Sequence, residues 1–149
     1  MSSNELDLRR EIIMDHYENP SAKVEDNTKF SIEYKSANND SPSCIDNLTA
    51  YVKIKNNKIN DIRFSGIGCA IATSSTDIMS NYLIGKDIKT ANKIITNYLG
   101  MLDGNKYDKK LLQDLFVFEN LNKQLNRIKC GKVGIQAIQM AISKNKEVF

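Results

Sequence analysis

Three cysteines, Cys44, Cys69 and Cys130, are the residues of this sequence with the clearest capacity for chemistry. An odd number of cysteines argues against a framework of paired disulfides and favours metal binding or reactive-thiol chemistry. Asp46 lies two residues after Cys44, and in an extended segment such residues point to the same side. Three thiolates and one carboxylate form a four-coordinate set that suits tetrahedral Zn²⁺. Thiolates also suit iron–sulfur clusters, so ligand type alone does not choose between the two.

Each of these residues also has a simpler interpretation. Unpaired cysteines are common as small buried apolar residues, and no two cysteines here have CxxC spacing. Asp46 could be an ordinary solvated carboxylate or could cap a turn. His16 is the single histidine, so this chain alone cannot supply a multi-histidine metal site. We expect His16 to be structural, with its polar ring packed near the end of a helix.

The sequence predicts a small antiparallel sheet around the first cysteine. Residues 30–34 alternate between apolar and polar, which is typical of a half-buried strand. Residues 38–43 have the composition of a loop, and this loop leads to Cys44. Two further strand-like runs, 48–55 and 58–64, are separated by Asn56-Asn57, a pair that suits a two-residue hairpin turn because asparagine tolerates positive φ. Three strands in a meander follow from this pattern.

Helices are predicted before and after the sheet. The apolar periodicity indicates five helices: 6–18, Ala70 to the residues before Gly85, 88–102, 108–118 and 131–144. Asp87 is the expected N-cap of the helix at 88–102. The segment 121–129 is ambiguous. Cys69 and Cys130 therefore fall at predicted helix N-termini, where unpaired N–H groups and the helix dipole favour a thiolate. Small residues on one face of the helix from Ala70 would let another element approach closely. We expect one α+β domain, 1–149, with a small sheet covered by helices on one face.

Composition and charge exclude several other classes of protein. The chain has 149 residues and 21 Lys and Arg against 18 Asp and Glu, a net charge of +3. The basic residues are scattered, and the abundance of Ile, Lys and Asn is what an A/T-rich coding sequence produces, so we expect no nucleic-acid partner. No apolar run approaches the roughly 20 residues of a membrane span, and the N-terminus shows no signal peptide. We expect a cytoplasmic protein without membrane association.

Four ordered segments of the sequence resemble the U-type iron–sulfur cluster assembly proteins, the family of SufU, IscU and the N-terminal domain of NifU. Residues 13–20 look like the family's opening helix and its DHYxNP ending, 38–46 like its NPxCGD loop, 64–79 like its FxGxGCxIxxASxSMM segment, and 127–130 like its RIKC segment. The long interval between Cys69 and Cys130 and the presence of Lys129, where IscU-type scaffolds carry a histidine, place the chain nearer SufU than IscU. The resemblance implies a SufE/NifU-like fold.

The resemblance also implies a site and a reaction. In SufU-type proteins zinc is held by the residues that match Cys44, Asp46, Cys69 and Cys130, and sulfur is accepted from a pyridoxal-phosphate cysteine desulfurase of the SufS type. A desulfurase histidine is thought to enter the zinc shell and release the residue matching Cys44, which then attacks the desulfurase persulfide. Thiolate attack on a sulfur–sulfur bond is ordinary exchange chemistry. Cys44 is therefore the expected catalytic residue.

The same residues are also compatible with two other functions. The same ligands could hold a [2Fe–2S] cluster that is assembled here and passed to apo iron–sulfur proteins or other Suf components, which would make the chain a scaffold and not an enzyme. A zinc-stabilised interaction domain without sulfur chemistry is the third reading. The family's glycine after the first cysteine is Ile45 here, and Asn47 stands where SufU-type proteins often have arginine. A β-branched residue follows a positive-φ path only with strain, so Ile45 either changes the course of the loop or shields the metal.

Overall fold

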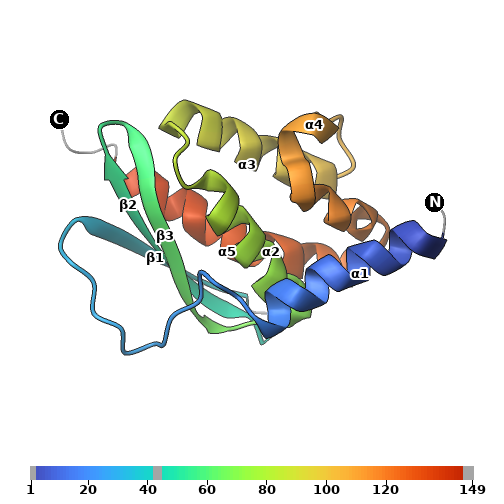
Figure 1. Cartoon of the computed structure of the whole chain (residues 1–149), viewed down its shortest axis with the longest axis horizontal. Helices are drawn as coiled ribbons and strands as arrows, with labels where there is room; N and C mark the ends of the chain where they lie inside the picture. The colour runs from blue at the N-terminus through green and yellow to red at the C-terminus, as the bar shows by residue number, and fades with distance from the viewer. Residues whose placement is uncertain (1–2, 42–44, 146–149) are drawn as a thin grey trace.

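A three-stranded antiparallel sheet lies along one side of the computed structural model, which describes residues 3–41 and 45–145 (Figure 1). Its strands β1 (Tyr34–Asp40), β2 (Asn47–Lys55) and β3 (Lys58–Ile67) pair in the order β1-β2-β3, which confirms the predicted meander. Asn56 and Asn57 turn the chain between β2 and β3 with φ of 52° and 62°. These positive values are those of the two-residue hairpin turn that the asparagine pair predicted.

The first strand is shifted relative to the prediction. We expected a strand at 30–34 and a loop from 38, but β1 begins at Tyr34 and continues to Asp40. The alternation before Tyr34 has another cause, since the Phe30 ring stacks on Tyr51 of β2 with 4.2 Å between ring centroids. Aromatic packing therefore accounts for Phe30, whereas Ile32 is 90% exposed and packs against no described residue that explains its apolar character. The polar end of β1 is held by side-chain hydrogen bonds, such as the one from Asn38 Nδ2 to Thr49 Oγ1 at 2.9 Å.

The helices and the 3₁₀ segment agree with the predictions in the middle of the chain and differ towards its end. The elements are α1 (Ser3–Glu18), α2 (Ala70–Leu83), α3 (Ile88–Leu102), α4 (Lys109–Leu112), the 3₁₀ helix η1 (Gln113–Lys123) and α5 (Leu125–Lys144). α3 has the predicted bounds, and Asp87 caps it by accepting a hydrogen bond from the Thr90 N–H at 2.7 Å. The single helix expected at 108–118 is wrong, because one short α-helical turn passes there into η1. The last helix begins six residues before the predicted start, at Leu125 instead of Gly131.

Helices α2 and α5 pack against one face of the sheet, with α1 on the outer side of α2 (Figure 1). The core on this face includes alternate residues of β2 and β3, among them Leu48, Val52, Ile62 and Phe64, all of which are buried. α2 is enclosed from both sides, so even its polar residues from Thr73 to Asp77 are buried. Among the described residues, no helix has both the length and the apolarity that crossing a membrane requires.

The axes of α2 and α5 approach closely at a glycine. A Cβ added to Gly134 of α5 would lie 1.7 Å from Thr76 Oγ1 of α2, so only glycine fits at this contact. The Thr76 hydroxyl donates to the Ala72 carbonyl at 2.6 Å, and Ser80 donates in the same way to the Thr76 carbonyl. These hydroxyls are therefore satisfied within the helix, and the small residues of α2 serve the close approach that the sequence predicted.

Candidate metal centre

Cys69 lies in the turn between β3 and α2, and a glycine shapes that turn. Gly66 has φ of +117°, and a Cβ there would lie 2.1 Å from the Asn47 carbonyl oxygen of the neighbouring strand, so the position requires glycine. The chain then reaches Cys69, the N-cap of α2, whose Sγ accepts a hydrogen bond from the Ala72 N–H at 3.4 Å. The prediction that Cys69 occupies a helix N-terminus is confirmed.

Asp46 precedes β2 and joins its carboxylate to the start of α2. Its side chain is fully buried, and Oδ1 accepts a hydrogen bond from the Cys69 N–H at 2.8 Å. Oδ2 lies 3.9 Å from Cys69 Sγ. Asp46 is thus no solvated carboxylate. It is a buried carboxyl group at a helix N-terminus, where the Cys69 N–H donates to it.

The prediction that Cys130 lies at the N-terminus of the last helix is wrong. Cys130 does not precede the last helix but lies within α5, well after the first residue Leu125. Its thiol is buried in a small apolar cluster that includes Phe64 and Val133. Burial raises the pKa of the Cys130 thiol well above its usual range, and the nearby Cys69 and Asp46 raise it further. The N-terminal dipole expected to favour a thiolate therefore does not act on this residue, because Cys130 is not at the helix end.

The fold brings Asp46, Cys69 and Cys130 together. One potential ligand atom from each, a carboxylate oxygen or a sulfur, lies within 4.8 Å of the others. Tetrahedral zinc with Zn–S bonds of ~2.3 Å places its ligand atoms about 3.5–4 Å apart, so small side-chain rotations would close the set. Three groups that each gain a negative charge on deprotonation are crowded in a mostly buried place, which is unfavourable unless a cation is bound. Sulfur and carboxylate donors fit Zn²⁺, and the sulfurs also fit iron.

The fourth predicted site residue, Cys44, lies outside the described residues. The neighbouring residue Ile45 lies within the described residues. Its side chain is 74% exposed, so it points to solvent and does not cover the two cysteines and the aspartate.

His16 is apart from this group and binds a residue that the sequence analysis missed. Its Nδ1 lies 2.6 Å from Oδ2 of Asp77, a fully buried carboxylate in α2. Asp77 Oδ1 also accepts from the Ala22 N–H at 2.8 Å, which ties the segment after α1 to α2. This arrangement agrees with the structural role expected for His16 at a helix end. The available signal was that Asp77 is the only charged residue in α2, so a buried partner could have been sought.

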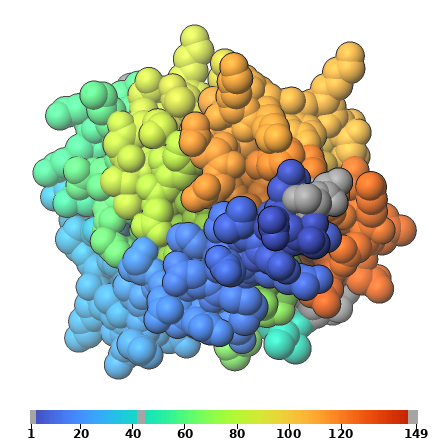
Figure 2. Space-filling view, turned by 45° about the vertical axis from the view of Figure 1, so that its right-hand side comes forward, coloured from blue at the N-terminus to red at the C-terminus, as the bar shows by residue number. Residues whose placement is uncertain are grey.

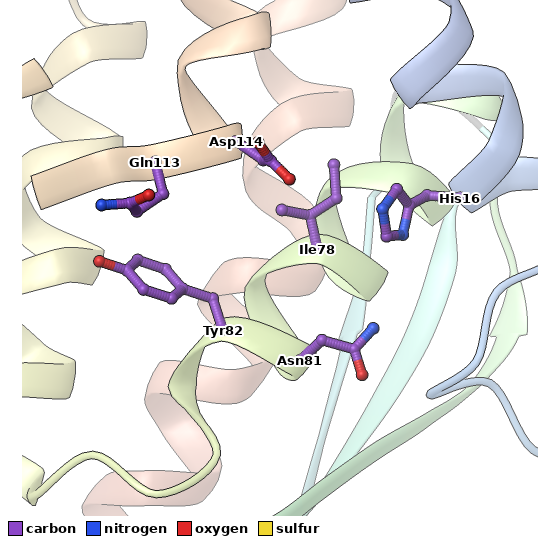
Figure 3. A pocket seen from close by; sticks show the side chains of 6 residues that line it. All are labelled: His16, Ile78, Asn81, Tyr82, Gln113 and Asp114. Atoms are coloured by element: carbon purple, nitrogen blue, oxygen red, sulfur yellow. The ribbon is translucent and has the colours of Figure 1, made fainter. Parts of the chain in front are cut away.

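A cavity of about 340 Å³ opens beside His16, between α1, α2 and the start of η1 (Figure 3). Its wall includes Asn81, Tyr82 and Asp114, and the Tyr82 hydroxyl donates to the Leu111 carbonyl at 2.6 Å. Asp46, Cys69 and Cys130 do not line it, so the cavity is separate from the candidate metal centre.

Comparisons with known proteins agree with the fold. The chain matches the family model described as the NifU-like N-terminal domain over residues 8–148. It is 30% identical over 140 residues to the zinc-dependent sulfurtransferase SufU of Bacillus subtilis (strain 168), covering 93% of this chain and 92% of that protein. It is 26% identical over 102 residues to the iron–sulfur cluster assembly scaffold protein IscU of Thermotoga maritima, covering 68% of this chain and 72% of IscU.

A solved structure has the same architecture. The crystal structure of a protein from Fervidobacterium islandicum AW-1, described as a putative iron–sulfur cluster assembly scaffold protein for the SUF system, superposes with a TM-score of 0.81. The two sequences are 27% identical, and the match covers 89% of this chain and 94% of the other.

Proposed function

The chain belongs to the NifU-like N-terminal domain family of iron–sulfur cluster assembly proteins, and from this premise we propose that it is a zinc-bound sulfur acceptor that takes sulfur from a cysteine desulfurase. The observation that carries the proposal is the convergence of Asp46, Cys69 and Cys130, whose ligand atoms lie within 4.8 Å of one another. Cys44 is proposed as the fourth ligand, since it precedes Asp46 by two residues. The name of the B. subtilis relative supports zinc as the metal.

The described residues have distinct roles in this proposal. The Asp46 carboxylate accepts a hydrogen bond from the Cys69 N–H, and this bond holds the carboxylate close to the Cys69 sulfur. Cys130 presents its sulfur from the buried side of α5. A bound Zn²⁺ would supply the positive charge that keeps these thiols deprotonated in a site where burial alone favours the neutral thiol of Cys130.

The proposed reaction is thiol–persulfide exchange at Cys44. The Cys44 thiolate attacks the outer sulfur of a cysteine persulfide on the desulfurase. A sulfur–sulfur bond forms at Cys44, the sulfur–sulfur bond on the desulfurase breaks, and the desulfurase cysteine leaves as a thiolate. The exchange transfers one sulfur atom and needs no external oxidant or reductant. Cys69 and Cys130 are anchored in or at helices, so they are less suited to this transfer than Cys44.

The test is the turnover of the partner desulfurase with and without this protein. Zinc-loaded wild type should raise turnover with cysteine as substrate, and Cys44→Ser should abolish the increase while retaining a folded protein. Cys69→Ala and Cys130→Ala should lose zinc and the increase together. Absence of any increase with zinc-loaded wild type would contradict the proposal.

A scaffold for a [2Fe–2S] cluster is the second candidate, because both the Thermotoga relative and the Fervidobacterium protein are described as scaffolds. The cluster would then be cargo, held by the same sulfurs and passed to an apo iron–sulfur protein. Anaerobic incubation with iron and sulfide, followed by visible absorption and transfer to an apo-acceptor, separates the two functions. A cluster that forms and is accepted by the apo-protein supports the scaffold, whereas zinc retention without cluster formation supports sulfur transfer.

A further inference from the structure

A groove next to the candidate metal centre is lined by three of the four arginines of the chain. Arg9 and Arg10 come from α1 and Arg127 from the first turn of α5, around a hollow of about 210 Å³. Figure 2 shows α1, in blue, lying alongside the orange residues that precede and begin α5. Lysine greatly outnumbers arginine in this sequence, yet within residues 3–41 and 45–145 no lysine, aspartate or glutamate lines the groove. A general excess of basic residues therefore does not explain the arginines.

The floor of the groove is apolar. Leu6 and Ile13 of α1 face Ile71 of α2 and Leu121 of η1 across it. Leu6 is 40% exposed, and Ile13 and Ile71 are half-buried. Apolar side chains thus remain in contact with water between the charged groups. An occupant with both apolar and acidic side chains would bury these surfaces and pair the arginines.

The three guanidinium groups differ in how they are held. Arg9 is fixed in place, because Nη2 donates to Glu119 Oε1 at 3.1 Å and the group lies over the Phe116 ring at 4.7 Å. Its Nη1 is buried and forms no hydrogen bond within the described part of the chain, so Arg9 retains an unused donor. Arg10 and Arg127 are exposed and form no ion pair with any described residue. Both are therefore available to an external carboxylate.

The groove and the metal centre share their supporting residues. Ile71 follows Cys69 by two residues and packs against the apolar cluster that contains Cys130. Arg127 precedes Cys130 by three residues on α5, and residues three apart lie on neighbouring parts of one helix face. A protein seated in the groove would consequently lie beside the site where sulfur is proposed to arrive.

We propose that this groove docks an acidic, apolar segment of the sulfur-donating protein, an inference that rests on the proposed function for the identity of the donor. The guanidinium fork matches the geometry of a carboxylate, which is why arginine is favoured over lysine where carboxylates are recognised. The apolar floor requires leucine-like or aromatic side chains between the acidic residues of that segment. A nucleic-acid strand would pair the arginines but leave Leu6 exposed.

The test is binding of the zinc-loaded, full-length protein to the cysteine desulfurase of the same organism, measured by isothermal titration calorimetry. Arg10→Gln/Arg127→Gln should raise Kd about tenfold or more, as expected when two interfacial charge pairs are lost. Lys89→Gln/Lys93→Gln on the exposed side of α3 removes the same charge outside the groove and should leave Kd within about twofold, since exposed charges away from an interface contribute little. The wild-type Kd should also rise with salt more steeply than that of the arginine variant.

Turnover measured on the same samples separates this inference from the proposed function. If the desulfurase binds and the arginine variant binds as tightly as wild type, or if the lysine variant is weakened equally, the docking groove is wrong and sulfur transfer is unaffected. If wild type does not bind the desulfurase at all, the groove inference is also overturned. If wild type binds through the arginines but does not raise turnover, the groove stands and the proposed function fails.

Discussion

At the scale of single side chains, Asp46 connects the candidate metal centre to the start of α2. It is fully buried, and its two oxygens face the N–H and the sulfur of Cys69. The carboxylate anchors the start of α2, and its proposed second role is to offer a ligand oxygen. The two roles can be separated, because asparagine retains an oxygen that accepts the Cys69 N–H but carries no charge.

Asp46→Asn should weaken zinc binding at least about tenfold while the protein stays folded, since lost ligand or supporting carboxylates typically cost 10–100-fold in metal affinity. Competition against a chromophoric chelator measures the affinity, and Asp26→Asn, an exposed carboxylate outside the site, is the control. Unchanged zinc affinity in Asp46→Asn would show that this carboxylate takes no part in binding.

His16 is expected to affect stability and not metal content. His16→Ala leaves the buried Asp77 carboxylate with only the Ala22 N–H among its described partners, and should lower the free energy of unfolding by about 1–3 kcal/mol. His16→Asn places an amide N–H near the position of Nδ1 and should recover part of that loss. Urea unfolding measures both variants. Loss of zinc from a folded His16→Ala protein would instead identify His16 as a ligand.

At the scale of elements, the contact between α2 and α5 holds the two cysteine-bearing helices together. Gly134→Ala places a methyl group 1.7 Å from Thr76 Oγ1, so the helices must separate. We expect a loss of about 1–3 kcal/mol in the free energy of unfolding, as is typical of overpacking, together with weaker zinc binding because Cys69 and Cys130 move apart. Adding Thr76→Ala removes the clashing hydroxyl and should restore part of both properties. Equal stability of Gly134→Ala and wild type would contradict the close approach.

Tyr34, the first residue of β1, should make the free energy of unfolding depend on pH in the alkaline range. Burial and the hydrogen bond that the Tyr34 hydroxyl donates to Asp61 raise the pKa of Tyr34 to about 12, from its ordinary value of 10.0. The folded state thus holds this proton more tightly than the unfolded chain. Its contribution to stability is complete below about pH 10 and is lost as the pH rises towards 12. Between these values wild type should lose stability more steeply than Tyr34→Phe in urea unfolding, and identical slopes would contradict the assignment.

Elements with local signals were predictable from sequence, and elements held by tertiary contacts were not. Asp87 caps α3, and Asn56-Asn57 forms the hairpin turn, because each depends on its own side chain and backbone. The start of α5 was missed because its N-cap Gln124 forms no side-chain cap hydrogen bond and the next residues are exposed. That error also placed Cys130 at a helix end and gave its thiol the wrong electrostatic environment.

At the scale of the whole molecule, the sheet and its two packed helices bring together residues that are far apart in the chain. Asp46 comes from the entry to β2, Cys69 from the junction of β3 and α2, and Cys130 from α5. The sequence could identify these residues by their types and by their family resemblance. It could not show that Asp46 is buried, that Asp77 pairs with His16, or that three arginines line one groove, because these depend on contacts between distant segments.

The most direct test of the central claim is to locate the transferred sulfur. Zinc-loaded protein is incubated with the desulfurase and cysteine, its thiols are alkylated, and the mass of each cysteine-containing peptide is determined. Sulfur transfer through Cys44 predicts one additional sulfur atom on the peptide of Cys44 in wild type and none on any peptide of Cys44→Ser. A protein that retains its zinc but gains no sulfur, or that gains it on Cys69 or Cys130 while Cys44 stays unmodified, would contradict this role of Cys44.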